Sequence, residues 1–417
     1  MTNQTHGNKY LFALILITSL FFFWGFVHNL DPILIPHLKK AFILNDLETS
    51  LIDFSVFIAY FLMALPAGYV MRKWGYKTGI ILGLAFFAMG SFLFLPAADT
   101  MQYPFFLGAL FIIASGLTFL ETAANPYVTI LGNPETATQR LNFSQSFNGL
   151  AAFLAPLLGG KFILSGKNLT ETELANMAPA LKNAYLTQEA SSVKEPYLIL
   201  GIIIVLVAIL FIFTKLPDIK NDDGDVDSAK ISHAWNFPHL RWAVIAQFFY
   251  VGAQVCVLSF FIRFVTTSAS IGEKEAAIYS GFAGLAFLIG RFAGTFIMTY
   301  VKPNRLLMIY AACCILLSLI AIFASGMITV YAIIGIAFFM SIMFPTIFSL
   351  GIVGLGSTTK IASSLIVMSI VGGAVLPLAL GYISDQTGSI KYGYLVPLCC
   401  FIFVFIFGWK KWKPVTL

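Results

Sequence analysis

The chain has 417 residues, of which 59% are hydrophobic and 11% are charged. A soluble globular domain carries about 25% charged residues, so this composition excludes one, and its hydrophobicity excludes a disordered chain. The net charge is only +6, and no basic run is long enough to follow a nucleic acid backbone. We therefore expect no nucleic acid partner and take the lipid bilayer as the surroundings of the chain.

Continuous apolar runs predict twelve membrane-spanning helices. A helix needs roughly 20 apolar residues to cross a bilayer. The runs do not alternate in polarity as the strands of a membrane β-barrel do, so we expect an all-α membrane protein. Turn and charge signals place the spans near residues 10–36, 48–71, 77–97, 102–127, 138–164, 196–214, 239–266, 275–299, 303–325, 328–352, 360–384 and 392–410.

A polar, Asp-rich interval divides these spans six by six. It predicts an N-terminal six-helix bundle at 1–214, a cytoplasmic linker at 215–238 and a C-terminal six-helix bundle at 239–417. More Lys and Arg residues fall on the side of both termini than on the other side. Because cytoplasmic loops carry the excess of Lys and Arg, both termini are predicted to be cytoplasmic.

The two halves resemble parallel copies of one another. Pro126 and Gly132 after the fourth span recur as Pro345 and Gly351 after the tenth, and further pairs recur at nearly the same offset. Two parallel six-helix bundles are the architecture of major facilitator transporters. The predicted fold is therefore the major facilitator fold, with a substrate site between the halves near the middle of the bilayer.

The fourth span contains a carboxyl group, that of Glu121, with Asn125 one turn further along the same face. An ionisable side chain inside a span is costly and faces a cavity or a partner. A carboxyl taken out of water binds a proton more readily. We interpret Glu121 and Asn125 as sugar-binding residues and Glu121 also as a cation-coupling residue; a structural carboxylic acid bonded to a neighbouring helix is the alternative.

The first span carries a second polar cluster, in which Asn29 and Asp31 precede Pro32. Pro32 has no N–H, so the carbonyl of His28 loses its helical donor. Broken helices of this kind coordinate cations and sugars. Asn29 is therefore a candidate sugar ligand and Asp31 a candidate cation-coupling residue, and a metal ligand if the ion is Na⁺; a role for Asp31 in capping a kink is the alternative.

Two further spans carry stripes of hydrogen-bonding side chains. Gln145 and Asn148 lie close to one face of the fifth span, and Gln247, Tyr250 and Gln254 follow one face of the seventh. Amide groups and an aromatic ring suit the hydroxyl rim and the C–H face of a sugar. These five residues are candidate sugar ligands, with hydrogen bonding between helices as the alternative for the amides.

The remaining charged residues and motifs narrow the class of protein. Asp53 is expected to be a helix-entry acid, and Arg291 is expected near a cytoplasmic gate or reaching towards the membrane surface. No Walker loop and no catalytic or metal-binding spacing occurs, so we expect neither an enzyme nor a cofactor. An ion channel, for which no filter-like loop is visible, and a sugar sensor without transport are the other classes considered.

Four stretches carry a resemblance to a known family: LETAANP at 120–126, RLNFSQSFN at 140–148, RWAVIAQFFYVGAQ at 241–254 and FPTIFSLG at 344–351. Together they resemble the fucose:proton symporter branch of the major facilitator superfamily, which includes glucose/galactose and sodium-dependent sugar transporters. The resemblance implies a bacterial inner-membrane symporter for a hexose or deoxyhexose such as fucose, glucose, galactose or mannose. It would work by alternating access as a monomer, with Glu121 coupling sugar to cation and Asn29, Gln145 and Gln247 lining the sugar site.

The first span departs from the pattern of this branch. Family members usually have Asn-Asp-Ile-Leu, whereas this chain has Asp31 followed by Pro32, Ile33 and Leu34. The acid lies one position earlier, about 100° around the helix. The expected coupling ion is therefore H⁺ by resemblance, with Na⁺ as the alternative.

Overall fold

The structure, a computed structural model, describes residues 4–44, 46–163, 176–217 and 231–414, and contains no strand among them. The all-α prediction is confirmed. The longer helices of the first half are α1 (Gln4–His28), α2 (Asp31–Phe42), α3 (Asp46–Thr100), α4 (Tyr103–Ile130), α5 (Ala137–Ile163), α7 (Pro179–Ser191) and α8 (Lys194–Phe213). Those of the second half are α10 (Pro238–Ser259), α11 (Phe261–Ala269), α12 (Glu273–Ile297), α13 (Pro303–Phe323), α14 (Met327–Met340), α15 (Met343–Ile352), α16 (Thr359–Met368), α17 (Gly372–Thr387) and α19 (Leu395–Ile406).

Within the described residues, ten helical stretches are long and apolar enough to cross a membrane. One of them is α3, whose 55 residues form two helices that meet at Gly75, where the backbone leaves the helical conformation (φ 84°, ψ 169°); these two helices are the expected second and third spans. The 27-residue helix α5 covers the expected fifth span. The described part of each of the twelve expected ranges therefore lies mainly in helix.

Two spans are interrupted near a proline. In each, the interruption lies close to the residue four positions before the proline, whose carbonyl would accept the helical hydrogen bond that proline cannot donate. Helix α1 ends at His28 and α2 begins at Asp31, next to Pro32. In the tenth span, α14 and α15 are separated around Ser341, four residues before Pro345. Because proline cannot donate a hydrogen bond, the carbonyls of His28 and Ser341 lose their helical partners.

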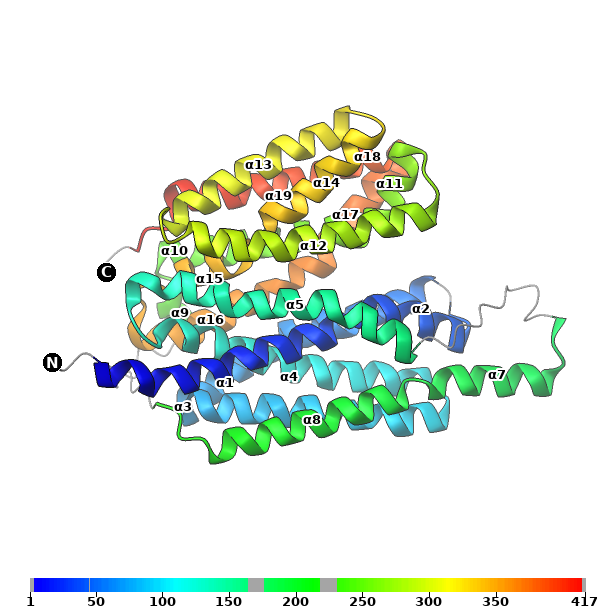
Figure 1. The fold of residues 1–417 in the computed structure, drawn as a ribbon, viewed down its shortest axis with the longest axis horizontal. Coiled ribbons are helices and arrows are strands. Elements are labelled where there is room, and N and C mark those ends of the chain that lie inside the picture. The colour runs from blue at the N-terminus through cyan, green and yellow to red at the C-terminus, as the bar shows by residue number, and fades with distance from the viewer. Residues whose placement is uncertain (1–3, 45, 164–175, 218–230, 415–417) are drawn as a thin grey trace.

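The helices form two groups, which Figure 1 shows one above the other. Helices α1 to α8 make up the N-terminal group, and helices α10 to α19 make up the C-terminal group. Both chain termini lie at the same end of the molecule, here called the terminal end. Helices α2, α7 and α11 and the short α18 (Ile390–Gly393) lie towards the opposite or far end (Figure 1). Residues 218–230 of the expected linker lie outside the described part of the chain.

Hydrogen bonds join the two groups at the terminal end. The hydroxyls of Thr138 on α5 and Ser349 on α15 lie 2.9 Å apart, and the Asn142 amide donates to the Thr346 hydroxyl at 3.2 Å. All four side chains are buried. The first turns of α5 are thus held against α15 of the other group.

Close backbone packing joins the groups at a second place on the terminal half. Gly68 of α3 lies so near α16 that a Cβ atom at this position would be 1.9 Å from the Ser364 hydroxyl. Only glycine allows this approach of the two helices. The contact depends on the groups staying together, because α3 and α16 belong to different groups.

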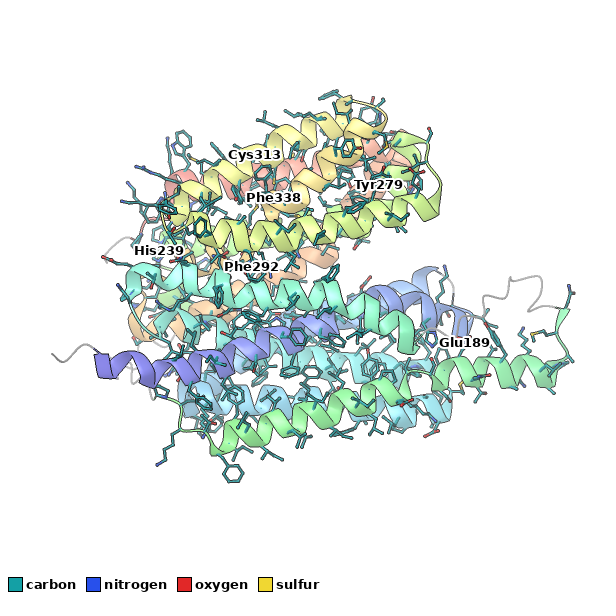
Figure 2. The ribbon with its side chains drawn as sticks, in the orientation of Figure 1. Glu189, His239, Tyr279, Phe292, Cys313 and Phe338 are labelled. Carbon is teal, nitrogen blue, oxygen red and sulfur yellow. The ribbon has the colours of Figure 1, made fainter. Side chains whose placement is uncertain are left out.

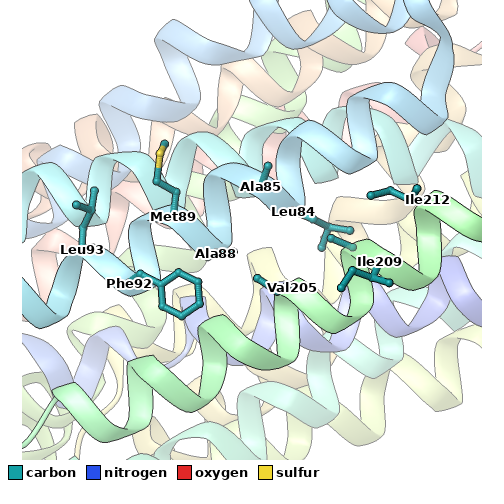
Figure 3. Close-up of a pocket in the computed structure, with 10 residues that line it drawn as sticks. Leu84, Ala85, Ala88, Met89, Phe92, Leu93, Val205, Ile209 and Ile212 are labelled. Atoms are coloured by element: carbon teal, nitrogen blue, oxygen red, sulfur yellow. The ribbon is translucent and has the colours of Figure 1, made fainter.

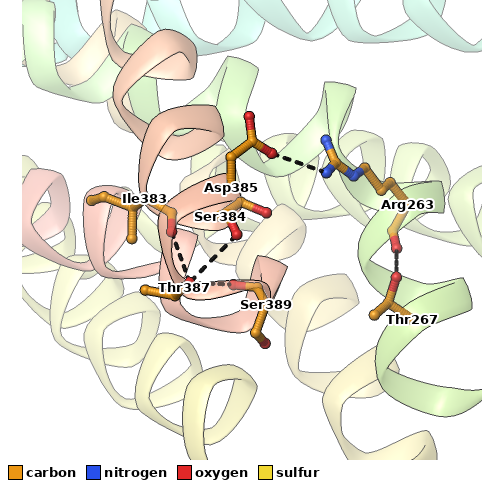
Figure 4. A network of polar contacts seen from close by, with 7 residues as sticks. All are labelled: Arg263, Thr267, Ile383, Ser384, Asp385, Thr387 and Ser389. Atoms are coloured by element: carbon orange, nitrogen blue, oxygen red, sulfur yellow. Dashed lines mark hydrogen bonds and ion pairs between the residues drawn. The ribbon is translucent and has the colours of Figure 1, made fainter.

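At the far end, contacts between basic side chains and carboxylates form within each group. Figure 2 shows Glu189 there, on α7, and His239 at the terminal end. The His37 Nδ1 atom of α2 lies 3.4 Å from Oε2 of Glu189, and both side chains are buried. In the C-terminal group Arg263 of α11 and Asp385 of α17 form an exposed ion pair at 3.6 Å (Figure 4). These pairs fix the far ends of helices inside a group and do not cross between groups.

Candidate functional site

Glu121 lies in the most buried helix of the N-terminal group. Helix α4 is buried continuously from Ile113 to Thr129, and 8% of the Glu121 surface is exposed. The hydroxyl of Tyr60 on α3 donates a hydrogen bond to Oε1 of Glu121 at 2.7 Å. Burial makes an ionised carboxylate costly, and the Tyr60 hydroxyl and any nearby positive charge offset part of that cost.

Asn125 and Gln145 lie next to one another, one turn from Glu121. The Gln145 amide on α5 donates to Oδ1 of Asn125 on α4 at 3.1 Å. Both side chains are buried, and Nδ2 of Asn125 has no hydrogen-bond partner among the described residues. A buried amide donor without a partner is costly, which makes it a position where a ligand hydroxyl or a water molecule would bind.

Arg291 of α12 connects the two groups at the level of this amide pair. Its Nη1 atom donates to the main-chain oxygen of Gln145 at 2.5 Å, and its Nε atom donates to the carbonyl of Ser341 at 2.9 Å. The guanidinium also lies over the Phe287 ring, 4.7 Å from its centre. The side chain is 4% exposed, so the expectation that it reaches towards the membrane surface is wrong.

The partner of Arg291 on the C-terminal side follows from the local backbone. Ser341 lies at the interruption between α14 and α15, and Pro345 leaves its carbonyl without a helical donor. The guanidinium supplies that donor. The Arg291 charge also interacts with Glu121 and with Tyr250, so these three residues belong to one electrostatic neighbourhood.

Helix α10 places two of its predicted ligands in the interior. Gln247 and Tyr250 have no exposed surface, and neither amide atom of Gln247 has a hydrogen-bond partner among the described residues. The Tyr250 ring lies edge to face with Phe344 of α15, with centroids 6.5 Å apart. Gln254, two turns further along, is half-buried. The C-terminal group thus offers an unsatisfied amide next to aromatic rings.

Asn29 and Asn148 meet at Gly25 of α1. The Asn29 amide, in the interruption between α1 and α2, donates to the carbonyl of Gly25 at 2.7 Å. A Cβ atom at Gly25 would lie 2.8 Å from Cγ of Asn148 on α5. The absence of a side chain at Gly25 therefore makes room for Asn148, and these two predicted sugar ligands both lie next to the same residue.

The acids outside α4 have different positions. The side chain of Asp31 lies outside the part of the chain that the structure describes, although its backbone begins α2. Asp53 is exposed and lies two turns after the start of α3 at Asp46, so it is not a helix-entry acid. Among the described residues no group of three or more His, Cys, Asp and Glu side chains is arranged to hold a metal ion.

Two functional candidates were missed by sequence reasoning. Tyr60 lies in an otherwise apolar run, and nothing in the sequence connects it with Glu121, 61 positions away. The bridging role of Arg291 has a sequence signal that could have been used. Pro345 predicts a carbonyl without a donor at Ser341, and Arg291 is the one arginine that lies more than three residues from both ends of a predicted span.

Comparisons with known proteins identify the family of the chain. The sequence model of the Major Facilitator Superfamily matches residues 12–356. A glucose/galactose transporter of Brucella abortus is 41% identical over 409 residues, which cover 98% of this chain and 96% of the relative. The L-fucose-proton symporter of Escherichia coli is 41% identical over 423 residues, which cover 98% and 95%.

Solved structures extend the likeness to three dimensions. A crystal structure of a major facilitator transporter, FucP, in the outward conformation superposes with a TM-score of 0.90, at 40% identity, over 97% of this chain and 99% of that one. The proton:xylose symporter XylE, 14% identical, shares the fold with a TM-score of 0.71. The predicted major facilitator fold is confirmed, and the chain belongs to the major facilitator superfamily of membrane transporters.

Proposed function

We propose that this chain is a secondary active transporter that couples the uptake of a sugar to the entry of protons. The observation that carries the proposal is the buried Glu121 carboxyl, bonded to Tyr60 and one helical turn from Asn125, whose buried Nδ2 atom has no hydrogen-bond partner among the described residues. Sugar hydroxyls both donate and accept hydrogen bonds, so they can satisfy the amides of Asn125 and Gln247. The names of the relatives, which transport fucose, glucose or galactose, support the same substrate class.

We propose further that the sugar site is formed by both halves. Residues 1–214 and 239–417 would act as two bundles joined by the cytoplasmic linker 215–238, as major facilitator transporters do. Glu121, Asn125, Gln145, Asn148 and Asn29 come from the first bundle, and Gln247, Tyr250 and Gln254 from the second. Because ligands come from both bundles, a sugar bound at the interface between them can draw the bundles together. Alternating access requires such a movement of one bundle relative to the other.

The contacts between the groups at the terminal end support a particular state of the cycle. With both termini cytoplasmic, as the Lys and Arg distribution favours, the hydrogen bonds between α5 and α15 close the cytoplasmic side. The sugar would then enter from outside. A bacterial inner membrane is the proposed location, and the monomer is the proposed transporting unit because the candidate ligands all come from one chain.

The proposed coupling ion is H⁺, and Na⁺ is the alternative. Glu121 with its neutral Tyr60 partner suits a group that takes up and releases a proton. Na⁺ would instead need several oxygen ligands, which Asp31 and the carbonyl freed before Pro32 could supply. No prosthetic cofactor is needed for either mechanism.

Uptake of radiolabelled sugar into proteoliposomes tests the proposal, with imposed pH and Na⁺ gradients applied separately. We expect accumulation above equilibrium with the pH gradient alone, for fucose, glucose, galactose or mannose. Accumulation with only the Na⁺ gradient would move the coupling role to Na⁺. If neither gradient drives accumulation, symport is contradicted. Sugar binding in detergent without any flux would indicate a sensor.

The Glu121→Gln variant tests the assigned carboxyl. It keeps the size and hydrogen-bonding capacity of the side chain but cannot ionise. We expect it to exchange labelled for unlabelled sugar at equal concentrations while failing to accumulate sugar uphill. Accumulation at the wild-type level would remove Glu121 from the coupling mechanism.

A further inference from the structure

One face of α3 follows the contact surface between the two groups of helices. On this face Gly68 lies against α16 of the C-terminal group. Ala64, Tyr60 and Phe57 follow on the same face, about one, two and three turns further towards the far end, and all three side chains are buried. Asp53, one more turn along the face, is exposed. The buried part of this face therefore ends at Phe57.

The Phe57 ring crosses from one group to the other and lies against the backbone of a glycine. A Cβ atom at Gly373 of α17 would be 2.7 Å from Cε1 of Phe57 and 3.1 Å from Cγ2 of Val255 on α10. Helices α10 and α17 both belong to the C-terminal group. Because glycine has no side chain, the backbone of α17 leaves room for an aromatic ring at this short distance. The two groups are therefore in contact at the ring of Phe57.

The candidate proton and sugar residues lie on the terminal side of this ring. Tyr60, which bonds Glu121, is one turn of α3 closer to the terminal end than Phe57. On α10, Gln247 is about two turns closer to the terminal end than Val255. A sugar that enters from the far end therefore meets the Phe57 ring before it reaches these residues.

Beyond the ring, the two groups separate towards the far end. Helices α5 and α12 are in contact at Gly149, where a Cβ atom would lie 3.3 Å from Cδ1 of Leu288. Figure 1 shows these two helices diverging towards the far end. Together with the exposed Asp53, this divergence indicates an entrance between the groups that ends at the Phe57 ring.

We propose that Phe57 is the outer gate of the sugar site, closed while its ring lies against Gly373 and open when the ring turns away. This inference rests on the proposed function, because it concerns the entry of the sugar. The ring has no hydrogen-bonding atom, so its contact with Gly373 offers nothing to water or to a hydrated ion. The closed gate therefore also separates the Glu121 carboxyl from water in the entrance.

The rate at which a thiol behind the ring reacts with a charged maleimide tests the gate. Gln247→Cys supplies this thiol in the full-length purified protein, after replacement of the five native cysteines. A disulfide formed by Thr138→Cys and Ser349→Cys, at hydroxyls 2.9 Å apart, holds the terminal end closed, so the reagent must arrive from the far end. We expect Phe57→Ala to speed the reaction about tenfold or more, because the closed state loses a packed aromatic ring.

A second phenylalanine of α3 provides a matched control. Phe92 lies in the apolar groove between α3 and α8 (Figure 3), and a Cβ atom at Gly201 of α8 would be 2.7 Å from its Cε1 atom. This contact of ring and glycine stays inside the N-terminal group, so Phe92→Ala should leave the rate at Gln247→Cys unchanged. A thiol placed outside the gate by Asp53→Cys should react equally fast with and without the Phe57 ring.

A change at the glycine tests the same contact while the ring is kept. Gly373→Ala fills the place of the Phe57 ring and should also speed the reaction at Gln247→Cys, whereas Gly201→Ala should not. An unchanged rate in both Phe57→Ala and Gly373→Ala would overturn the gate, and so would an equal increase in Phe92→Ala. The reaction needs no sugar, so a failure of the transport proposal would appear in the uptake assay and not in this one.

Discussion

Arg291 gives the most quantitative prediction, because one of its hydrogen bonds crosses between the groups and the other does not. The Nη1 bond to Gln145 joins α12 to α5, while the Nε bond to Ser341 stays inside the C-terminal group. Only the first bond must break when the terminal end opens. A hydrogen bond from a charged group contributes about 1.5–3 kcal/mol, so replacing Arg291 by leucine should shift the closing equilibrium about 10- to 150-fold towards the open form.

Distances between spin labels measure this equilibrium. Glu135 in the N-terminal group and Val353 in the C-terminal group are exposed at the terminal end, and pulsed electron resonance reports their separation. The five native cysteines, all free thiols, would first be replaced, in a background that still transports. We expect a single short distance in the otherwise wild-type protein and a large second population at longer distance in Arg291→Leu.

Two control variants separate the bridge from general effects of charge. Arg291→Lys keeps the charge but cannot reach both carbonyls with a fixed fork of donors, so its open population should be intermediate. Arg305→Leu removes an exposed arginine at the same end and should leave the distances unchanged. A folded Arg291→Leu protein with the wild-type distance distribution would refute the reasoning.

Two further predictions concern packing and hydrogen bonding around the site. Gly68→Ala places a methyl group 1.9 Å from the Ser364 hydroxyl, so it should favour the open form in the spin-label assay. Adding Ser364→Gly to this variant should restore the closed form. If the double variant stays open, the close approach of the two helices is not the cause. Tyr60→Phe removes the hydroxyl that bonds Glu121. The loss of one hydrogen bond costs about 1 kcal/mol, so the external pH at which uptake is half-maximal should differ from that of the wild-type protein. Unchanged pH dependence of uptake in Tyr60→Phe would mean that this hydrogen bond plays no part in proton coupling.

Much of the fold could be predicted from the sequence, because a bilayer leaves the backbone few choices. Apolar runs predicted the span positions, and Pro32 marked where the first span is interrupted. The break inside α3 also falls where the sequence places one, because Arg72, Lys73 and Lys77 surround Gly75, where the backbone leaves the helical conformation.

The site could be predicted only within single helices. Helical spacing put Glu121 and Asn125 on one face, and both are buried in the structure. The contacts of Glu121 with Tyr60 and of Gln145 with Arg291 depend on which helices become neighbours, which the spacing within one helix does not determine. Asn29, a predicted sugar ligand, also illustrates this, because its amide bonds back to Gly25 of the preceding helix α1.

The proton movement that accompanies sugar entry tests the central claim most directly. Sugar would be added to de-energised, lightly buffered vesicles that contain the protein, and a pH electrode would record the outside medium. The account predicts that the medium becomes alkaline with the wild-type protein, and that it does not with Glu121→Gln, although that variant still exchanges sugar. Sugar entry through the wild-type protein without any change in external pH would contradict the account.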